Sequence, residues 1–136
     1  MIYKKILIPV DGSDKSILAA RHGAELASRV GAKVTLVHVI PTLPVDVRSL
    51  VLDKISAQGE EILKKSAQEI SEFNVGTGTE IIIGHPADAI CRKARSGKYS
   101  IIVMGSRGLS GVKGYLLGSV SSAVVSHAQC PVLIVR

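Results

Sequence analysis

Five short runs of β-branched and apolar residues alternate with helical patterns, and this alternation limits the possible folds more than any other feature of the chain. Turn residues bound each run, as is typical of strands buried on both faces. The runs are "KKILIPV" (Lys4 to Val10), "KVTLVHV" (Lys33 to Val39), "TEIII" (Thr79 to Ile83), "SIIVM" (Ser100 to Met104) and "PVLIV" (Pro131 to Val135). The pattern predicts an α/β fold, an open parallel sheet with helices on both faces.

Four helices are expected between and after these runs. The first follows the capping residues of "DGSD" and ends at Gly31, and a second, long helix carries apolar residues at helical spacing from Val47 to Ile70. The third begins at Pro86 and ends before Gly97, in keeping with the preference for proline at the start of a helix and glycine just past its end. A short fourth helix is expected from about Ser119 to His127.

Length and composition indicate one domain that spans residues 1–136. The 46% hydrophobic content is enough for a real core, and no apolar run approaches the roughly 20 residues of a membrane span. The start, "MIYKKILIPV", lacks the pattern of a signal peptide, so we expect a cytoplasmic protein. The glycine-rich "NVGTGT" (Asn74 to Thr79) is expected to be a turn. Cys91 and Cys130 have no paired spacing and are expected to be reduced and structural.

The positive charge is concentrated in the last third of the chain. The net charge is +6, and no Asp or Glu occurs from Ala89 to Arg136. This imbalance favours an anionic ligand in that region. The four basic residues between Arg92 and Lys98 are also compatible with the solvated face of one helix, whereas Arg107 and Lys113 lie inside a glycine-rich stretch.

That stretch, "MGSRGLSGVKGYLLGS" (Met104 to Ser119), follows the fourth predicted strand. In open α/β sheets, ligands bind beyond the carboxyl ends of the strands where the strand order reverses, which for the order 3-2-1-4-5 lies between strands one and four. Glycines let backbone N–H groups approach phosphate oxygens, and a helix that starts at Gly118 and Ser119 would add its own free N–H groups. The alternative is a flexible connection without a ligand.

The spacing Gly105-x2-Gly108-x9-Gly118-Ser119 resembles the G-2x-G-9x-G-(S/T) pattern of ATP-binding members of the universal stress protein family. The resemblance extends along the chain, through "KKILIPVDGSDKS", "VTLVHVI", "IIVMGSRGLSG" and "CPVLIVR". It implies a five-stranded sheet of order 3-2-1-4-5 in a Rossmann-like fold, a bound adenine nucleotide and a homodimer.

The resemblance also implies a set of binding residues. Around the adenosine it places Pro9, Val10, Asp11, Val39, Met104 and Gly105, and around the phosphates Gly108, Gly118, Ser119, Val120 and Ser121. Arg107 could add positive charge there. Asp11 has two interpretations: it binds the ribose hydroxyls or Mg²⁺ through water, or it caps the following helix together with Ser13 or Asp14.

The ligand is therefore expected to be ATP, ADP or AMP, with Mg²⁺ as a further candidate. The P-loop pattern is missing, and nothing obvious would orient an attacking water, so we expect little or slow hydrolysis in a stress-response regulator or sensor. A slow ATPase or phosphotransferase is the alternative. The pI of about 9.6 makes nucleic-acid binding a third possibility. Aromatic residues make up only 3% of the chain, however, so side chains on which bases could stack are scarce.

The apolar last strand carries a prediction about assembly. If Pro131 to Val135 lies at a sheet edge, its open hydrogen-bonding groups invite the same strand of a second copy. We therefore expect a homodimer through this strand.

Overall fold

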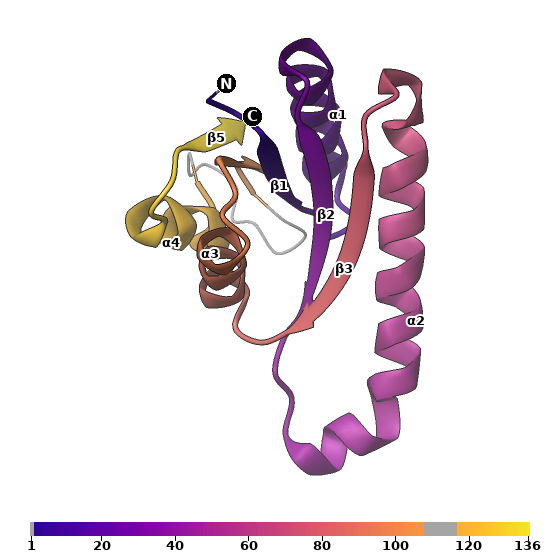
Figure 1. The fold of residues 1–136 in the computed structure, drawn as a ribbon. Helices are drawn as coiled ribbons and strands as arrows, with labels where there is room; N and C mark the ends of the chain where they lie inside the picture. The colour runs from indigo at the N-terminus through magenta and orange to yellow at the C-terminus, as the bar shows by residue number, and fades with distance from the viewer. Residues whose placement is uncertain (1, 108–116) are drawn as a thin grey trace.

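The computed structural model describes residues 2–107 and 117–136, and its strands form one parallel sheet (Figure 1). In chain order the strands are β1 (Lys5–Pro9), β2 (Lys33–Ile40), β3 (Thr77–Ile83), β4 (Ile101–Gly105) and β5 (Val132–Val135). In space their order is β3-β2-β1-β4-β5, and all four pairings are parallel. The predicted sheet order is confirmed, and the order reverses direction between β1 and β4.

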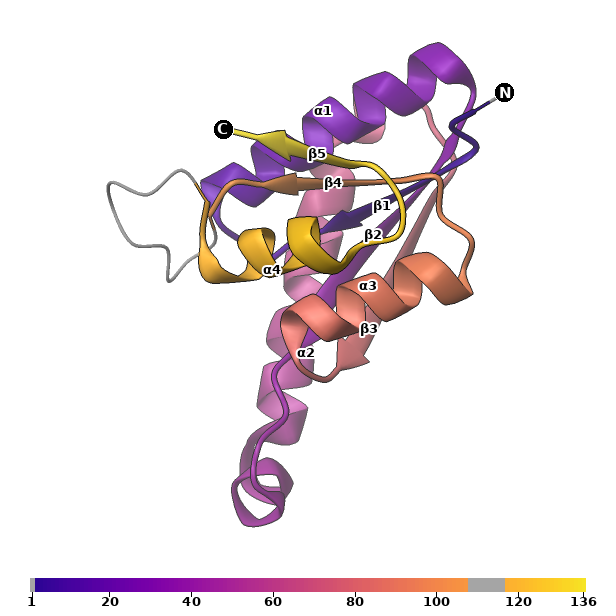
Figure 2. The ribbon, with the colours of Figure 1, turned by 90° about the vertical axis from the view of Figure 1, so that its left-hand side faces the viewer.

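Helices cover both faces of this sheet, as predicted (Figures 1 and 2). One face carries α1 (Asp14–Val30) and α2 (Val45–Glu69), and the other carries α3 (Pro86–Ser96) and α4 (Ser119–His127). Successive residues of a strand point to opposite faces, so in β1 Ile6 and Ile8 pack in the core under α1 while Leu7 packs in the core under α3 and α4. All three side chains are fully buried.

Helix α1 illustrates how local sequence sets the position of an element at the sheet. It begins where the Ser13 hydroxyl accepts a hydrogen bond from the Ser16 backbone N–H at 3.2 Å, and it ends at Gly31, whose φ of 74° lies in the left-handed region. Its buried face is made of small residues, among them Ala20, Gly23 and Ala24. The helix therefore lies close to β1, which fixes the loop between them.

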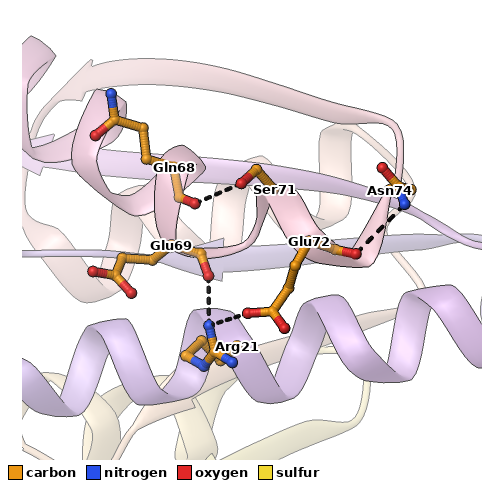
Figure 3. A network of polar contacts seen from close by, with 6 residues as sticks. All are labelled: Arg21, Gln68, Glu69, Ser71, Glu72 and Asn74. Carbon is orange, nitrogen blue, oxygen red and sulfur yellow. Dashed lines mark hydrogen bonds and ion pairs between the residues drawn. The ribbon is translucent and has the colours of Figure 1, made fainter.

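The carboxyl end of α2 is attached to α1 by one arginine (Figure 3). Nη1 of Arg21 donates a hydrogen bond to the Glu69 carbonyl at 2.7 Å and lies 2.8 Å from a carboxylate oxygen of Glu72, in the short 3-10 helix η1 (Ser71–Phe73). The guanidinium also lies over the Phe73 ring, 5.4 Å from its centre. These contacts tie together two helices that are separated along the chain by β2.

One prediction about the strands is wrong, and another holds for the inner strands. "NVGTGT" is not a turn throughout, because β3 already begins at Thr77, which pairs with Val34 of β2. The expectation that the strands are mostly buried on both faces holds for β1, β2 and β4, whereas β3 and β5 are the edges of the described sheet and most of their residues keep some exposure. Only the inner strands have neighbours on both sides.

The first turns of α2 project past the end of the sheet (Figures 1 and 2). Val47, expected at the start of the buried stripe, is exposed there together with Val45 and Leu50. The stripe contacts the sheet only farther along, where Leu63 is buried. Within residues 2–107 and 117–136, no helix combines the length and apolar character needed to cross a membrane.

Candidate functional site

A cavity of about 630 Å³, called here the first cavity, opens beyond the carboxyl ends of β1, β2 and β4. Every binding residue predicted from the sequence that the structure describes lines it: Pro9, Val10, Asp11, Val39, Met104, Gly105, Arg107, Gly118, Ser119, Val120 and Ser121. The remaining predicted residue, Gly108, lies outside the described residues, as does Lys113. The cavity lies where the strand order reverses, the usual position of a ligand in such sheets.

The end of β1 supplies fixed backbone groups and an apolar wall. The Val10 N–H donates to the Val37 carbonyl at 2.8 Å, and the Val10 carbonyl lies 2.8 Å from Nδ1 of His38. Because a carbonyl only accepts, the proton of this bond is on His38 Nδ1. The Val10 side chain is 3% exposed, and Val39 and Met104 also line this end of the cavity.

Asp11 combines a local structural contact with a position in the cavity wall. Its Oδ1 accepts from the backbone N–H of Ser13 at 2.9 Å and from the Ser13 hydroxyl at 2.6 Å. The residue that caps α1 is Ser13, and Asp11 holds that capping hydroxyl in place. The capping interpretation therefore holds for Ser13 with support from Asp11, and Asp11 is also a lining residue.

The opposite wall is the start of α4. Gly118 is its N-cap residue, with φ −77° and ψ 175°, and no side-chain hydrogen bond from the described residues caps the helix. The Gly118 N–H donates to the Ser106 carbonyl at 2.7 Å, and the buried Ser121 hydroxyl donates to the same oxygen at 2.7 Å. The first backbone N–H groups of a helix have no acceptor inside it, so the first turn of α4 offers donors to the cavity.

The two glycines that frame this wall differ in what surrounds them. A Cβ at Gly105 would lie 3.0 Å from the carbonyl oxygen of Lys15, in the first turn of α1. Among the described residues, the atom nearest to a Cβ at Gly118 would be the Cα of Arg107 at 3.5 Å, an ordinary contact. Packing among the described residues therefore favours glycine at 105 but not at 118, the N-cap position beside the donors of α4.

The charges around the cavity suit an anion. Among its described lining residues Arg107 is the only arginine or lysine, and Asp11 is the only acidic residue. The positive end of the α4 dipole adds to the potential on the Gly118 side. Anionic groups are therefore favoured at α4, and apolar groups at the end of β1.

Sequence reasoning missed part of the lining. Helix α2 contributes Ile55, Gln58 and Ile62, α3 contributes Pro86 and Ile90, and the rest are Ser16, Val37, His38, Ile40, Pro41 and Leu117. Ile40 is the last residue of β2 and Pro41 follows it, so the rule about carboxyl ends could have found them. The residues of α2 and α3 carry no such signal, because their place depends on how each helix packs on the sheet.

No group of three or more His, Cys, Asp or Glu side chains in the described part of the chain is arranged to hold a metal ion. Magnesium usually takes only one or two carboxylates together with phosphate oxygens and waters. Asp11 alone fits that smaller requirement, so Mg²⁺ at this site would depend on the phosphates of a ligand.

Comparisons with known proteins agree with one another. A family model described as "Universal stress protein family" matches residues 2–136. Universal stress protein MJ0531 of Methanocaldococcus jannaschii is 38% identical over 141 residues, which cover 99% of this chain and 83% of that protein.

Similar solved structures include complexes with adenine nucleotides. A universal stress protein in complex with cAMP has a TM-score of 0.83 and 26% identity, over 100% of this chain and 99% of that one. The universal stress protein from Archaeoglobus fulgidus in complex with dAMP has a TM-score of 0.76 and 26% identity, over 100% of both chains.

Proposed function

The chain belongs to the universal stress protein family, and on this basis we propose that it binds ATP or a related adenine nucleotide in the first cavity. The observation that carries the proposal is that all the described binding residues expected from the sequence line this one cavity. The cAMP and dAMP complexes of two relatives support it.

In this proposal the adenine ring lies against Val10, Val39 and Met104. The first cavity, at about 630 Å³, is within the range of roughly 300–1,000 Å³ that is typical of small-molecule sites. Micromolar binding needs about 8 kcal/mol. Hydrogen bonds to charged groups contribute about 1.5–3 kcal/mol each, before ordering and desolvation costs. Burial of the base is therefore needed, in addition to the phosphate contacts, to reach micromolar affinity.

The phosphates would lie at the start of α4. The backbone N–H groups of Ser119, Val120 and Ser121 belong to the uncapped first turn of α4, and the exposed Ser119 hydroxyl is a further donor. Arg107 would add positive charge beside them. A phosphate role for Gly108 is proposed on the resemblance alone, because the residue lies outside the described part of the chain.

Asp11 is proposed to bind the ribose hydroxyls or, through water, a Mg²⁺ ion that the phosphates bring with them. Its hydrogen bonds with Ser13 hold the carboxylate in place at the cavity wall. We further propose binding with little or slow hydrolysis, because Asp11 is the only acidic residue among the described lining residues and its Oδ1 already accepts from Ser13. The protein would then act as a stress-response sensor or regulator in the cytoplasm, as a homodimer.

The test is a calorimetric titration of the purified protein with ATP and Mg²⁺, in the wild type and in Gly118→Val. The new side chain would occupy the space beside the α4 donors, and at φ −77° and ψ 175° the backbone at this position suits valine. We expect ATP affinity to fall by a factor of about 100, equivalent to the loss of one or two charged hydrogen bonds.

Gly78→Val is the matched control. Gly78 lies in the edge strand β3, a Cβ there would approach only the Thr35 hydroxyl, at 3.9 Å, and the residue does not line the first cavity. Both variants should keep the circular dichroism spectrum of the wild type. A folded Gly118→Val protein with unchanged ATP affinity would refute the proposed phosphate position. Phosphate released during the titration would measure hydrolysis directly.

The same titration with duplex DNA at two salt concentrations tests the nucleic-acid alternative. Binding to phosphate backbones weakens steeply as salt rises. Affinity for DNA with that salt dependence, and none for ATP, would favour the alternative.

A further inference from the structure

A second cavity, of about 610 Å³, adjoins the first on the face of the sheet that carries α3 and α4. Pro86, Ser119 and Val120 line both cavities, so the two meet at the start of α3 and of α4. Figure 2 shows these helices side by side on that face. Their buried apolar side chains belong to one hydrophobic cluster. The first cavity alone is large enough for a mononucleotide, which leaves the second without a role in the proposed function.

The lining of the second cavity is apolar in one part and basic in another. Pro86, Ala87, Val120 and Ala123 supply the apolar part, together with Cys91. Burial raises the pKa of the Cys91 thiol, so this side chain stays uncharged near neutral pH. A flat apolar group of limited size would fit against these small side chains.

The basic part consists of Arg92, Arg95, His85 and His127. Asp88 is the only acidic residue among the described lining residues, and it is paired with Arg92, with 3.1 Å between the carboxylate oxygen and Nε. Both members of that pair are more than half exposed, so the ion pair is weak. The Arg92 side chain can therefore leave Asp88 and bind a phosphate group. Arginine recognises phosphate through two parallel hydrogen bonds and also stacks on flat rings.

We propose that the second cavity binds the distal nucleoside of a dinucleoside polyphosphate whose first adenosine occupies the first cavity. The inference rests on the proposed function and extends it from a mononucleotide to a larger ligand class. The phosphate chain would cross the shared wall at Ser119 and Val120, and the distal base would lie on the small apolar side chains between Arg92 and Arg95. A mononucleotide with a longer phosphate tail would satisfy the arginines but not the apolar part.

The test compares three ligands by calorimetry: ATP, adenosine tetraphosphate and diadenosine tetraphosphate. Joining two binding groups in one molecule makes the second contact intramolecular, so we expect diadenosine tetraphosphate to bind about tenfold or more tightly than ATP. Adenosine tetraphosphate should bind more tightly than ATP but clearly more weakly than diadenosine tetraphosphate, because its tail reaches the arginines without placing a nucleoside on the apolar part.

Two variants locate the extra affinity. In the double variant Arg92→Ala/Arg95→Ala, and separately in Ala123→Glu, the advantage of diadenosine tetraphosphate should vanish while ATP affinity stays within about twofold of the wild type. The control is Lys64→Ala, which removes an exposed positive charge on α2 that lines neither cavity. It should retain the full advantage.

The outcomes separate this inference from the proposed function. If ATP binds and diadenosine tetraphosphate binds no more tightly, the second cavity is not a nucleoside site and only this inference falls. The inference also falls if adenosine tetraphosphate matches the dinucleotide, or if the advantage persists in both variants. If none of the three ligands binds, the proposed function fails and this inference fails with it.

Discussion

At the scale of single residues, Gly105 and Gly118 belong to the same sequence motif but differ in their structural surroundings. At Gly105 a side chain would press on the backbone of α1, and at Gly118 a Cβ would make only ordinary contacts with the described residues. The sequence motif predicted both as ligand residues. The structure adds that Gly105 is required by packing within the protein, whereas nothing in the described protein requires Gly118.

This difference predicts that alanine lowers the free energy of unfolding at position 105 but hardly changes it at position 118. Gly105→Ala should lower the free energy of unfolding by about 1–3 kcal/mol, since its Cβ would lie 3.0 Å from the Lys15 carbonyl oxygen and force the first turn of α1 to move. Gly118→Ala should change it by less than about 0.5 kcal/mol, as at positions without a special packing or backbone requirement. Urea unfolding of both variants measures these values. Equal losses, or a larger loss for Gly118→Ala, would contradict this distinction.

At the scale of helices and strands, most of the fold could be predicted from periodicity. The four helices and five strands are present, because strong apolar patterns and clear caps are local signals. The start of β3 was not predicted, because Thr77 joins the strand through its pairing with Val34, which is distant in sequence. The contribution of α2 to the first cavity was missed for a similar reason, since the placement of Gln58 depends on packing between elements.

The contacts of Arg21 in α1 with the end of α2 are expected to stabilise the packing of these two helices. Arg21→Ala should lower the free energy of unfolding by about 1–2 kcal/mol, because it removes the hydrogen bond to the Glu69 carbonyl, the ion pair with Glu72 and the contact with Phe73. Chemical denaturation measures this loss.

Glu72→Gln is the matched control, because it removes only the charge of the ion pair. The two side chains are 38% and 63% exposed, so its cost should stay below about 1 kcal/mol and shrink with added salt. An Arg21→Ala loss no larger than that of Glu72→Gln would mean that the Glu69 and Phe73 contacts add nothing.

At the scale of the whole molecule, β5 leaves one edge of the described sheet open. The Ile102 N–H donates to the Pro131 carbonyl and the Ser106 N–H to the Val135 carbonyl, so the alternate residues Val132 and Ile134 direct their backbone groups away from β4. The Leu133 side chain is 40% exposed on this edge strand. These features support the homodimer that the sequence predicts.

We expect light scattering at micromolar concentration to give the mass of a dimer for the wild type and of a monomer for Leu133→Lys. A charged lysine on an edge strand opposes pairing with another chain. The control is Thr79→Lys on the opposite edge strand, β3, which should remain dimeric. A wild-type monomer, or dissociation by the Thr79 variant as well, would contradict assembly through β5.

Ser106 belongs both to the edge-strand region and to the wall of the first cavity. Its N–H donates to Val135 at the end of β5, and its carbonyl accepts from Gly118 and Ser121 at the start of α4. A shift of α4 toward a ligand would therefore pull on the residue that is hydrogen-bonded to β5, the strand through which we expect two copies to associate. Thermodynamic reciprocity then requires that if nucleotide strengthens subunit association by some factor, association strengthens nucleotide binding by that same factor.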